Sequence, residues 1–96
     1  MKTRIDEMEH ATARYTSPLH VYSDIQAERK RQDARWGHRD WTPESYTAVA
    51  VLTEEVGEVA RACLDKEGIH RLREELVQVA AVAVCWIEAL DRARHE

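Results

Sequence analysis

The sequence predicts an all-α fold, an antiparallel helical bundle, on three observations. Three long segments carry apolar residues at the spacing of a helix with a buried face. Two of these segments follow helix-start signals, Ser17-Pro18 and Thr42-Pro43, in which a hydroxyl residue caps and proline opens the helix. Only residues 65–68 separate the last two segments, so these two helices are expected to run antiparallel as neighbours.

Length and charge limit the classes of function. A chain of ninety-six residues is long enough for one domain. We expect a helical domain over residues 18–96 and an N-terminal arm or short helix over residues 1–17. The net charge of -4 mixes both signs and offers no general basic surface, which argues against a nucleic-acid partner. The longest apolar run, residues 79–87, is too short to cross a bilayer, and there is no secretory signal. A cytoplasmic protein without a membrane partner is therefore expected, with Cys63 and Cys85 as buried free thiols.

The first helix is expected at residues 18–34. Leu19, Tyr22 and Ile25 recur at three-residue steps and predict its apolar face. Its second half, residues 28–35, is polar and net positive. The periodicity then breaks at residues 36–41, where Gly37 is the expected point of chain reversal.

The second helix is expected at residues 43–64. Thr42 would be its N-cap, Pro43 its first residue, and Glu44 an acid near its positive end. A wide apolar stripe follows from the helical spacing of Ala48, Val49, Leu52, Val56, Val59, Ala60 and Cys63.

The third helix is expected at residues 69–92. Between Leu76 and Leu90 only Gln78 and Glu88 are polar, so the helix is apolar nearly all the way round. One neighbouring helix cannot cover such a surface. We therefore expect the central helix of a bundle that a second copy of the chain completes, with Trp86 in the core or in the dimer interface.

Acidic residues interrupt the apolar pattern of both later helices. Glu55 and Glu58 border the stripe of the second helix, and Glu75 and Gln78 have the same three-residue spacing in the third. Antiparallel packing would let both pairs face a common cleft. Oxygen ligands without thiols or paired histidines select magnesium, manganese or calcium over zinc, and magnesium in turn suggests a phosphate-bearing ligand.

A compensating arginine is the alternative to a metal. Several carboxylates beside apolar surface are costly unless a cation neutralises them. Arg61, Arg71 and Arg73 are close enough in sequence to supply that charge. In that case the acids would be a solvated, salt-bridged face of the bundle.

These residues carry a family resemblance. The strings Leu-Thr-Glu-Glu-Val-Gly-Glu-Val and Arg-Glu-Glu-Leu-Val-Gln-Val-Ala, with Glu28-Arg29-x-Arg31-Gln32 and Trp36-Gly37 upstream, resemble the MazG-like family of all-α nucleotide pyrophosphohydrolases over residues 25–90. The resemblance implies a helical bundle, dimeric or higher, that binds magnesium through four acids. It also implies hydrolysis of a (deoxy)nucleoside triphosphate to a monophosphate and pyrophosphate.

Roles follow residue by residue. Glu55, Glu58 and Glu75 match the family's metal-ligand positions, and Gln78 stands where the family has Asp. Glu54, just before the first ligand, is the candidate to orient or deprotonate the attacking water. Candidate phosphate contacts are Lys30, Arg31, Lys66 and Arg73, and candidate base contacts are Trp36, His38 and Trp41, each of which has ordinary packing as its alternative.

Gln78 leaves three outcomes open. Its amide oxygen binds metal without adding negative charge, so the enzyme would work with fewer ions, or Glu54 or Glu74 would substitute. In the third outcome the protein has lost catalysis and kept nucleotide binding. A non-catalytic helical dimer that binds nucleotide or a protein partner is therefore the second hypothesis.

Overall fold

The computed structural model describes residues 18–94, and within them the chain is entirely helical apart from its connections. The helices are α2 (Pro18–Trp36), α3 (Tyr46–Leu64) and α4 (Ile69–Arg94). The arm or short helix expected at residues 1–17, and the cap expected at Ser17, lie outside the described residues. The all-α prediction is confirmed for the described part of the chain.

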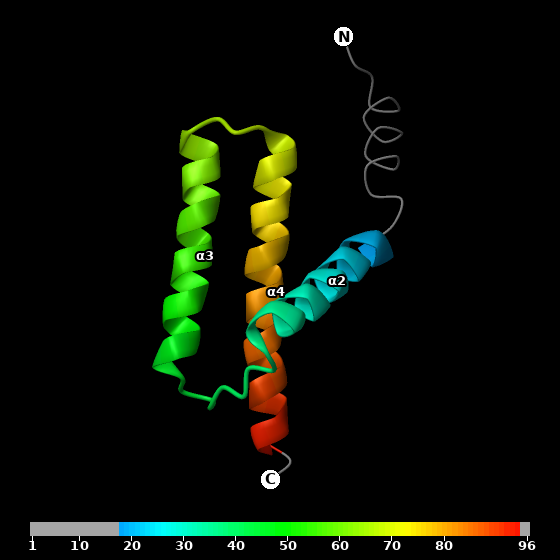
Figure 1. Ribbon diagram of the computed structural model, residues 1–96, viewed down its shortest axis with the longest axis vertical. Coiled ribbons are helices and arrows are strands. Elements are labelled where there is room, and N and C mark those ends of the chain that lie inside the picture. Colours follow the sequence, from blue (N-terminus) through cyan, green and yellow to red (C-terminus); the bar gives the residue numbers. More distant parts are fainter. Residues whose placement is uncertain (1–17, 95–96) are drawn as a thin grey trace, which may run out of the picture.

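Helix α4 is the central element of the fold. Figure 1 shows α3 and α4 side by side and antiparallel, while α2 crosses α4 obliquely. Both α2 and α3 pack against α4, but they do not pack against each other. The small residues Ala48 and Ala62 of α3 and Ala81 and Ala89 of α4 are almost fully buried, which lets the helices approach closely.

The start of α3 differs from the prediction. The helix begins at Tyr46, and the N-cap is Ser45, whose hydroxyl accepts a hydrogen bond from Ala48 N at 3.0 Å. Thr42 instead opens a turn in which its carbonyl accepts from Ser45 N at 3.2 Å. Trp86 of α4 holds this turn by donating from Nε1 to Pro43 O at 3.0 Å. A side-chain anchor remote in sequence thus keeps Pro43 out of the helix.

The other helix ends lie close to the prediction. Helix α2 continues two residues beyond the expected end, to Trp36, and α4 continues two residues beyond Arg92. Gly37 has a φ of 79° and donates from its backbone N to Asp33 O at 2.8 Å, so it reverses the chain as expected. In the α3–α4 connection, both Lys66 (φ 52°) and Gly68 (φ 96°) adopt a positive φ, the left-handed backbone conformation.

The apolar stripe of α3 is only partly covered by the chain itself. Ala48 and Ala62 are buried and Leu52 and Val59 are half-buried, whereas Val49, Val56, Ala60 and Cys63 are exposed. The expectation that Cys63 is a buried thiol is therefore wrong for the single chain, because its side of the helix turns away from α4. Cys85 is buried as expected, and burial raises the pKa of its thiol.

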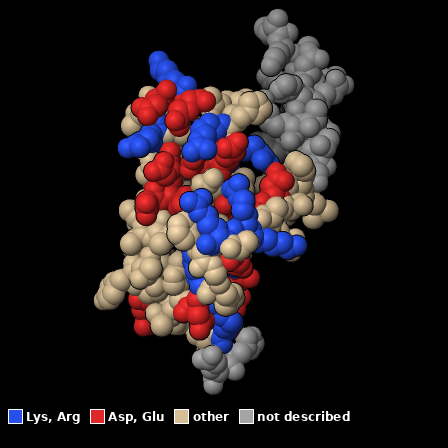
Figure 2. All heavy atoms as spheres, viewed as in Figure 1, with Lys and Arg blue, Asp and Glu red and all other residues tan. Residues whose placement is uncertain are grey.

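Charged side chains of both signs are interspersed on the face of the molecule that Figure 2 shows. This mixture agrees with the modest net charge of -4. None of the described helices combines the length with the apolar composition that crossing a membrane requires.

Candidate functional site

Carboxylates from all three helices converge on one side of α4. Glu28 projects from α2, Glu55 from α3 and Glu75 from α4. Glu75 is 2% exposed and Glu28 8% exposed, which is rare for ionised side chains without partners. The sequence placed Glu55 and Glu75 here but missed Glu28, although Glu28 extends the three-residue repeat of Leu19, Tyr22 and Ile25.

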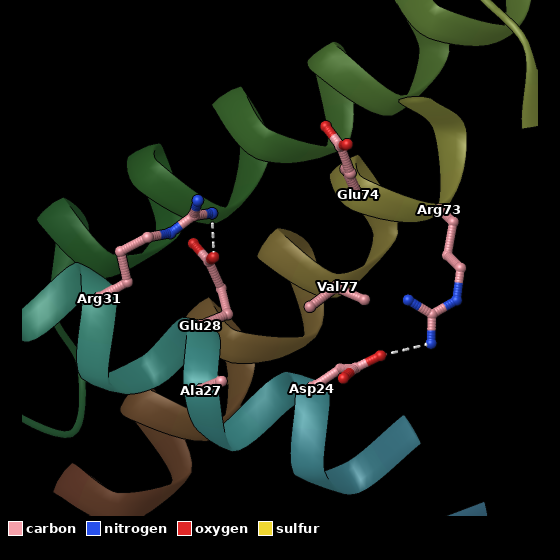
Figure 3. A pocket seen from close by; sticks show the side chains of 7 residues that line it. All are labelled: Asp24, Ala27, Glu28, Arg31, Arg73, Glu74 and Val77. Carbon is pink, nitrogen blue, oxygen red and sulfur yellow. Dashed lines mark hydrogen bonds and ion pairs between the residues drawn. The ribbon is translucent and has the colours of Figure 1, made fainter. Parts of the chain in front are cut away.

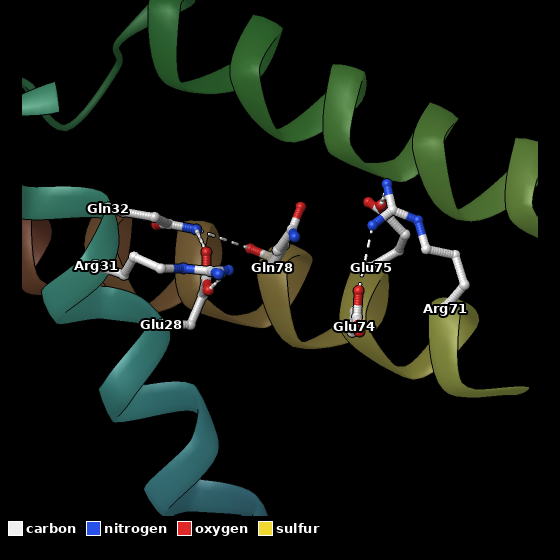
Figure 4. Close-up of polar contacts among 7 residues, drawn as sticks. All are labelled: Glu28, Arg31, Gln32, Arg71, Glu74, Glu75 and Gln78. Atoms are coloured by element: carbon white, nitrogen blue, oxygen red, sulfur yellow. Dashed lines mark hydrogen bonds and ion pairs between the residues drawn. The ribbon is translucent and has the colours of Figure 1, made fainter. Parts of the chain in front are cut away.

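Gln78 lies between two of these carboxylates. Its side chain is directed from α4 toward α3 (Figure 4). With its nitrogen facing the acids, the amide donates from Nε2 to Glu75 Oε2 and to Glu55 Oε2, each at 3.3 Å. Turned by 180°, the amide presents its oxygen to the same two atoms, and three oxygens then converge. The position therefore suits either a self-satisfied polar cluster or a bound cation.

Arginines neutralise the two most buried acids. Arg71 Nη2 lies 2.7 Å from Glu75 Oε1, and its Nη1 also reaches Glu74 Oε2 at 3.2 Å. Arg31 pairs with Glu28 through Nη2 and Glu28 Oε1. Of the three arginines expected as compensating cations, Arg71 takes this role for Glu75, while Arg73 pairs with Asp24 at 2.7 Å.

Glu55 is the acid of the cluster whose charge is destabilised by its surroundings. Burial raises the pKa of the Glu55 carboxyl, and the negative charges of Glu75, Glu54, Glu58 and Glu28 raise it further. Glu58 is half-buried one turn along α3, and Glu54 is exposed. The carboxylates are thus close enough to repel one another, which is the condition that a bound cation relieves.

A cavity of about 290 Å³ opens beside the cluster. Its lining includes Glu55 and Gln78 on one side and the C-terminal part of α2 on the other. All lining residues together are Glu28, Arg31, Gln32, Arg35, Trp36, Arg39, Glu55, Gln78 and Val82. We call this the acid–arginine cavity, because acids and arginines occupy its walls together.

A second cavity of about 290 Å³ lies between α2 and α4 (Figure 3). It shares Glu28 and Arg31 with the acid–arginine cavity, so this ion pair stands between the two. Arg73 and Asp24 form the opposite wall, and Glu74 and Val77 also line it. The two candidate phosphate contacts Arg31 and Arg73 thus border one cavity.

Other predicted contacts lie apart from these cavities. Lys30 and His38 are exposed and Lys66 lies in the α3–α4 connection; none of the three lines either cavity. Trp36 lines the acid–arginine cavity and is 60% exposed, so one indole is available for stacking. Trp41 is half-buried under the Arg39 guanidinium, 5.2 Å from Cζ to the ring centroid.

Arg35 and Arg39 are lining residues that the sequence reasoning missed. Arg31, Arg35 and Arg39 follow one another at four-residue steps, which is the spacing of one helix face. That spacing was a usable signal, although α2 ends at Trp36 and Arg39 belongs to the connection.

Comparison of the chain with protein-family models, with curated proteins and with solved structures gives no match. The functional argument therefore rests on the residues and on their arrangement.

Proposed function

We propose that the chain is a magnesium-dependent nucleotide pyrophosphohydrolase that cleaves a (deoxy)nucleoside triphosphate to a monophosphate and pyrophosphate. The observation that carries this proposal is the convergence of Glu28, Glu55 and Glu75 from three helices beside a cavity that also holds arginines and an exposed indole. Acids suit a hard cation, arginines suit phosphate, and an aromatic face suits a base. The resemblance to MazG-like enzymes supports the same assignment.

The donor set fits one magnesium ion that is shared with substrate. Within residues 18–94, no three His, Cys, Asp or Glu side chains are grouped so that they would hold a metal. Glu55 and Glu75 together with the Gln78 amide oxygen nevertheless supply three oxygens at one place. Magnesium in proteins is commonly held by one or two carboxylates, with water and substrate phosphates completing its shell. This set fits such a site rather than an all-protein cage.

The proposed roles of the other site residues do not depend on how a metal ion is coordinated. Arg31 at the cavity wall would contact phosphate oxygens, and Trp36 would stack on the base. Glu54 is exposed next to the cluster and would accept the proton of the attacking water. When bound, magnesium would neutralise phosphate charge, which is the main requirement for cleaving a phosphoanhydride.

The direct test is an assay of pyrophosphate release from a panel of nucleotides with Mg²⁺. Glu55→Ala should lower kcat/KM by about a hundredfold or more, because it removes a carboxylate from the centre of the cluster. Glu58→Ala should also lower activity. Glu44→Ala is the matched control, since Glu44 is exposed in the turn before α3. An activity that survives both Glu55→Ala and Glu58→Ala would refute the proposed mechanism.

Nucleotide binding without hydrolysis is the second candidate. The observation in its favour is that the Gln78 amide, Arg71 and Arg31 can compensate the carboxylates without any metal. Calorimetry of nucleotide with and without Mg²⁺, run beside the pyrophosphate assay, separates the candidates. Binding without cleavage in the wild type, with cleavage gained by Gln78→Asp, would establish the silent site.

We further propose that the functional unit is a homodimer or a higher homo-oligomer. Val49 and Val56 on α3, and Ile87 and Leu90 on α4, are large apolar side chains left exposed by the single chain. Ile87 and Leu90 belong to an apolar hollow whose lining residues are Pro43, Leu52, Ala83, Trp86, Ile87 and Leu90. A second copy would remove this surface from water, which favours association by about 25 cal/mol per Å².

A further inference from the structure

Arg39 is held between two indoles at the rim of the acid–arginine cavity. Its Cζ lies 5.2 Å from the ring centroid of Trp41 and 5.9 Å from that of Trp36. Arg35 approaches Trp36 as well, with Cζ at 4.8 Å from the ring centroid. Two guanidinium groups therefore lie within cation–π distance of indole rings, which restricts their positions at the cavity.

The Arg39 guanidinium is incompletely satisfied. Its Nη1 is buried and has no hydrogen-bond partner among the described residues. Arg29, Arg71 and Arg73, by contrast, each pair with a carboxylate within 3 Å. A guanidinium stays charged at any physiological pH, and a buried donor without an acceptor costs free energy. An anion in the cavity would supply the missing acceptor.

The charges of the cavity are arranged in two parts. Arg31 pairs with Glu28, so in the absence of a ligand these two charges largely offset each other. Arg35 and Arg39 line the cavity, and neither has a carboxylate at ion-pair distance within residues 18–94. Glu55 lies beside Gln78 in the same lining. One part of the cavity is therefore suited to an anion and the other to a cation.

We infer that Arg35 and Arg39, clamped by Trp36 and Trp41, form an oligophosphate-binding subsite in the acid–arginine cavity. Guanidinium groups donate in pairs to phosphate oxygens, and the cation–π contacts hold them in place before the ligand arrives. The identity of the anion as the phosphate chain of a nucleotide rests on the proposed function. The anion affinity itself depends on neither Mg²⁺ nor hydrolysis.

The test uses the full chain and inorganic tripolyphosphate, which has no base, in buffer with EDTA and about 150 mM salt. Isothermal calorimetry should show saturable binding, and intrinsic fluorescence should change because Trp36 and Trp41 contact the arginine that binds. Arg39→Ala should weaken binding at least tenfold. Arg39→Lys should weaken it less, because it keeps the charge and loses the paired donors.

Arg61→Ala is the matched control, since Arg61 is exposed on α3 and does not line the cavity. It removes the same charge and should leave the tripolyphosphate affinity unchanged. Thermal unfolding of every variant identifies loss of fold, and Arg39→Lys keeps the test valid if Arg39→Ala unfolds.

Equal binding by wild type and Arg39→Ala, or no binding by the folded wild type, would overturn the inference. Failure of the proposed function gives a different result. If the wild type binds tripolyphosphate in EDTA but releases no pyrophosphate from any nucleotide with Mg²⁺, the phosphate-binding subsite is supported and the proposed hydrolase activity is refuted.

Discussion

The Gln78 amide lies 3.3 Å from Glu55 Oε2, so a neutral side chain of α4 occupies the space next to a strained carboxylate of α3. The same amide reaches Glu75 Oε2 at an equal distance. An amide nitrogen at this position gives two hydrogen bonds to the acids, whereas a carboxylate would repel both. Residue 78 therefore decides how strongly the cluster depends on a cation.

Gln78→Asp should make the fold depend on Mg²⁺. Without metal, we expect the free energy of unfolding to fall by about 1–3 kcal/mol, because two hydrogen bonds are replaced by repulsion. With Mg²⁺, the added charge should raise metal affinity about tenfold over the wild type. Thermal unfolding over a Mg²⁺ titration measures both effects.

Gln78→Glu serves as the near-isosteric companion, since it adds the charge with little change in shape. It should also lose stability in EDTA and regain it with Mg²⁺. If neither variant responds to Mg²⁺ more strongly than the wild type, the acids of this cluster do not form a metal site.

The raised pKa of Glu55 predicts a pH-dependent loss of stability. A carboxyl whose pKa is higher in the folded than in the unfolded chain binds its proton more tightly when folded. Its stabilising contribution is complete below the unfolded value near 4.5 and is lost as pH rises through the raised folded value. Glu55→Gln should remove this loss, so the variant should gain stability over wild type as pH rises.

Urea unfolding at a series of pH values from about 4 to 7, in EDTA, measures this difference. Glu44→Gln is the control, because Glu44 is an exposed acid outside the cluster. A difference between Glu55→Gln and wild type that stays constant with pH would contradict the assigned electrostatic strain. Saturating Mg²⁺ should reverse the advantage of Glu55→Gln, because the ion stabilises only the charged form.

Ser45→Ala should lower the free energy of unfolding by about 1 kcal/mol, the usual value of a side-chain N-cap. The reason is the lost hydrogen bond from Ala48 N to the Ser45 hydroxyl. Thr42→Ala is the matched control and should change stability little, since only its backbone carbonyl takes part in the turn. Chemical denaturation of both variants would show the opposite ranking if Thr42 were the cap.

The helices and most of the acidic cluster followed from local sequence. Apolar spacing placed all three helices close to their observed bounds, and three-residue spacing placed Glu55, Glu75 and Gln78 on facing surfaces. The cap of α3 did not follow, because the turn at Pro43 is held by Trp86, which is remote in sequence.

Part of the partner choice in the cluster also lay beyond the sequence. Arg71 stands four residues before Glu75, the spacing of an ion pair on one helix face, so local spacing favoured this pair. The pairing of Arg73 with Asp24 instead depends on how α2 crosses α4. Arg39 was missed for a related reason. It follows the end of α2, so its return to the cavity depends on the path of the connection and on Trp41.

Ile87→Lys should convert the proposed dimer to monomers. Ile87 is 54% exposed in the single chain, and it lines the apolar hollow with Leu52 and Leu90. Burying a charged ammonium there without a partner is costly, so the dissociation constant should rise by about a hundredfold or more. Light scattering at micromolar concentration should give about twice the chain mass of 11.1 kDa for wild type and one chain mass for the variant.

Gln26→Lys adds the same charge at an exposed position of α2 and should leave the dimer intact. A monomeric wild type would refute the dimer directly. A dimeric Ile87→Lys variant would show that the interface lies on another surface. If the interface extends from the hollow along the exposed apolar side of α3 that carries Val56 and Ala60, Cys63 should also become less reactive toward a thiol reagent as protein concentration rises, because it is exposed on that side. The same dilution series applied to Ile87→Lys should show no such protection, which links the exposed thiol to assembly rather than to the fold of one chain.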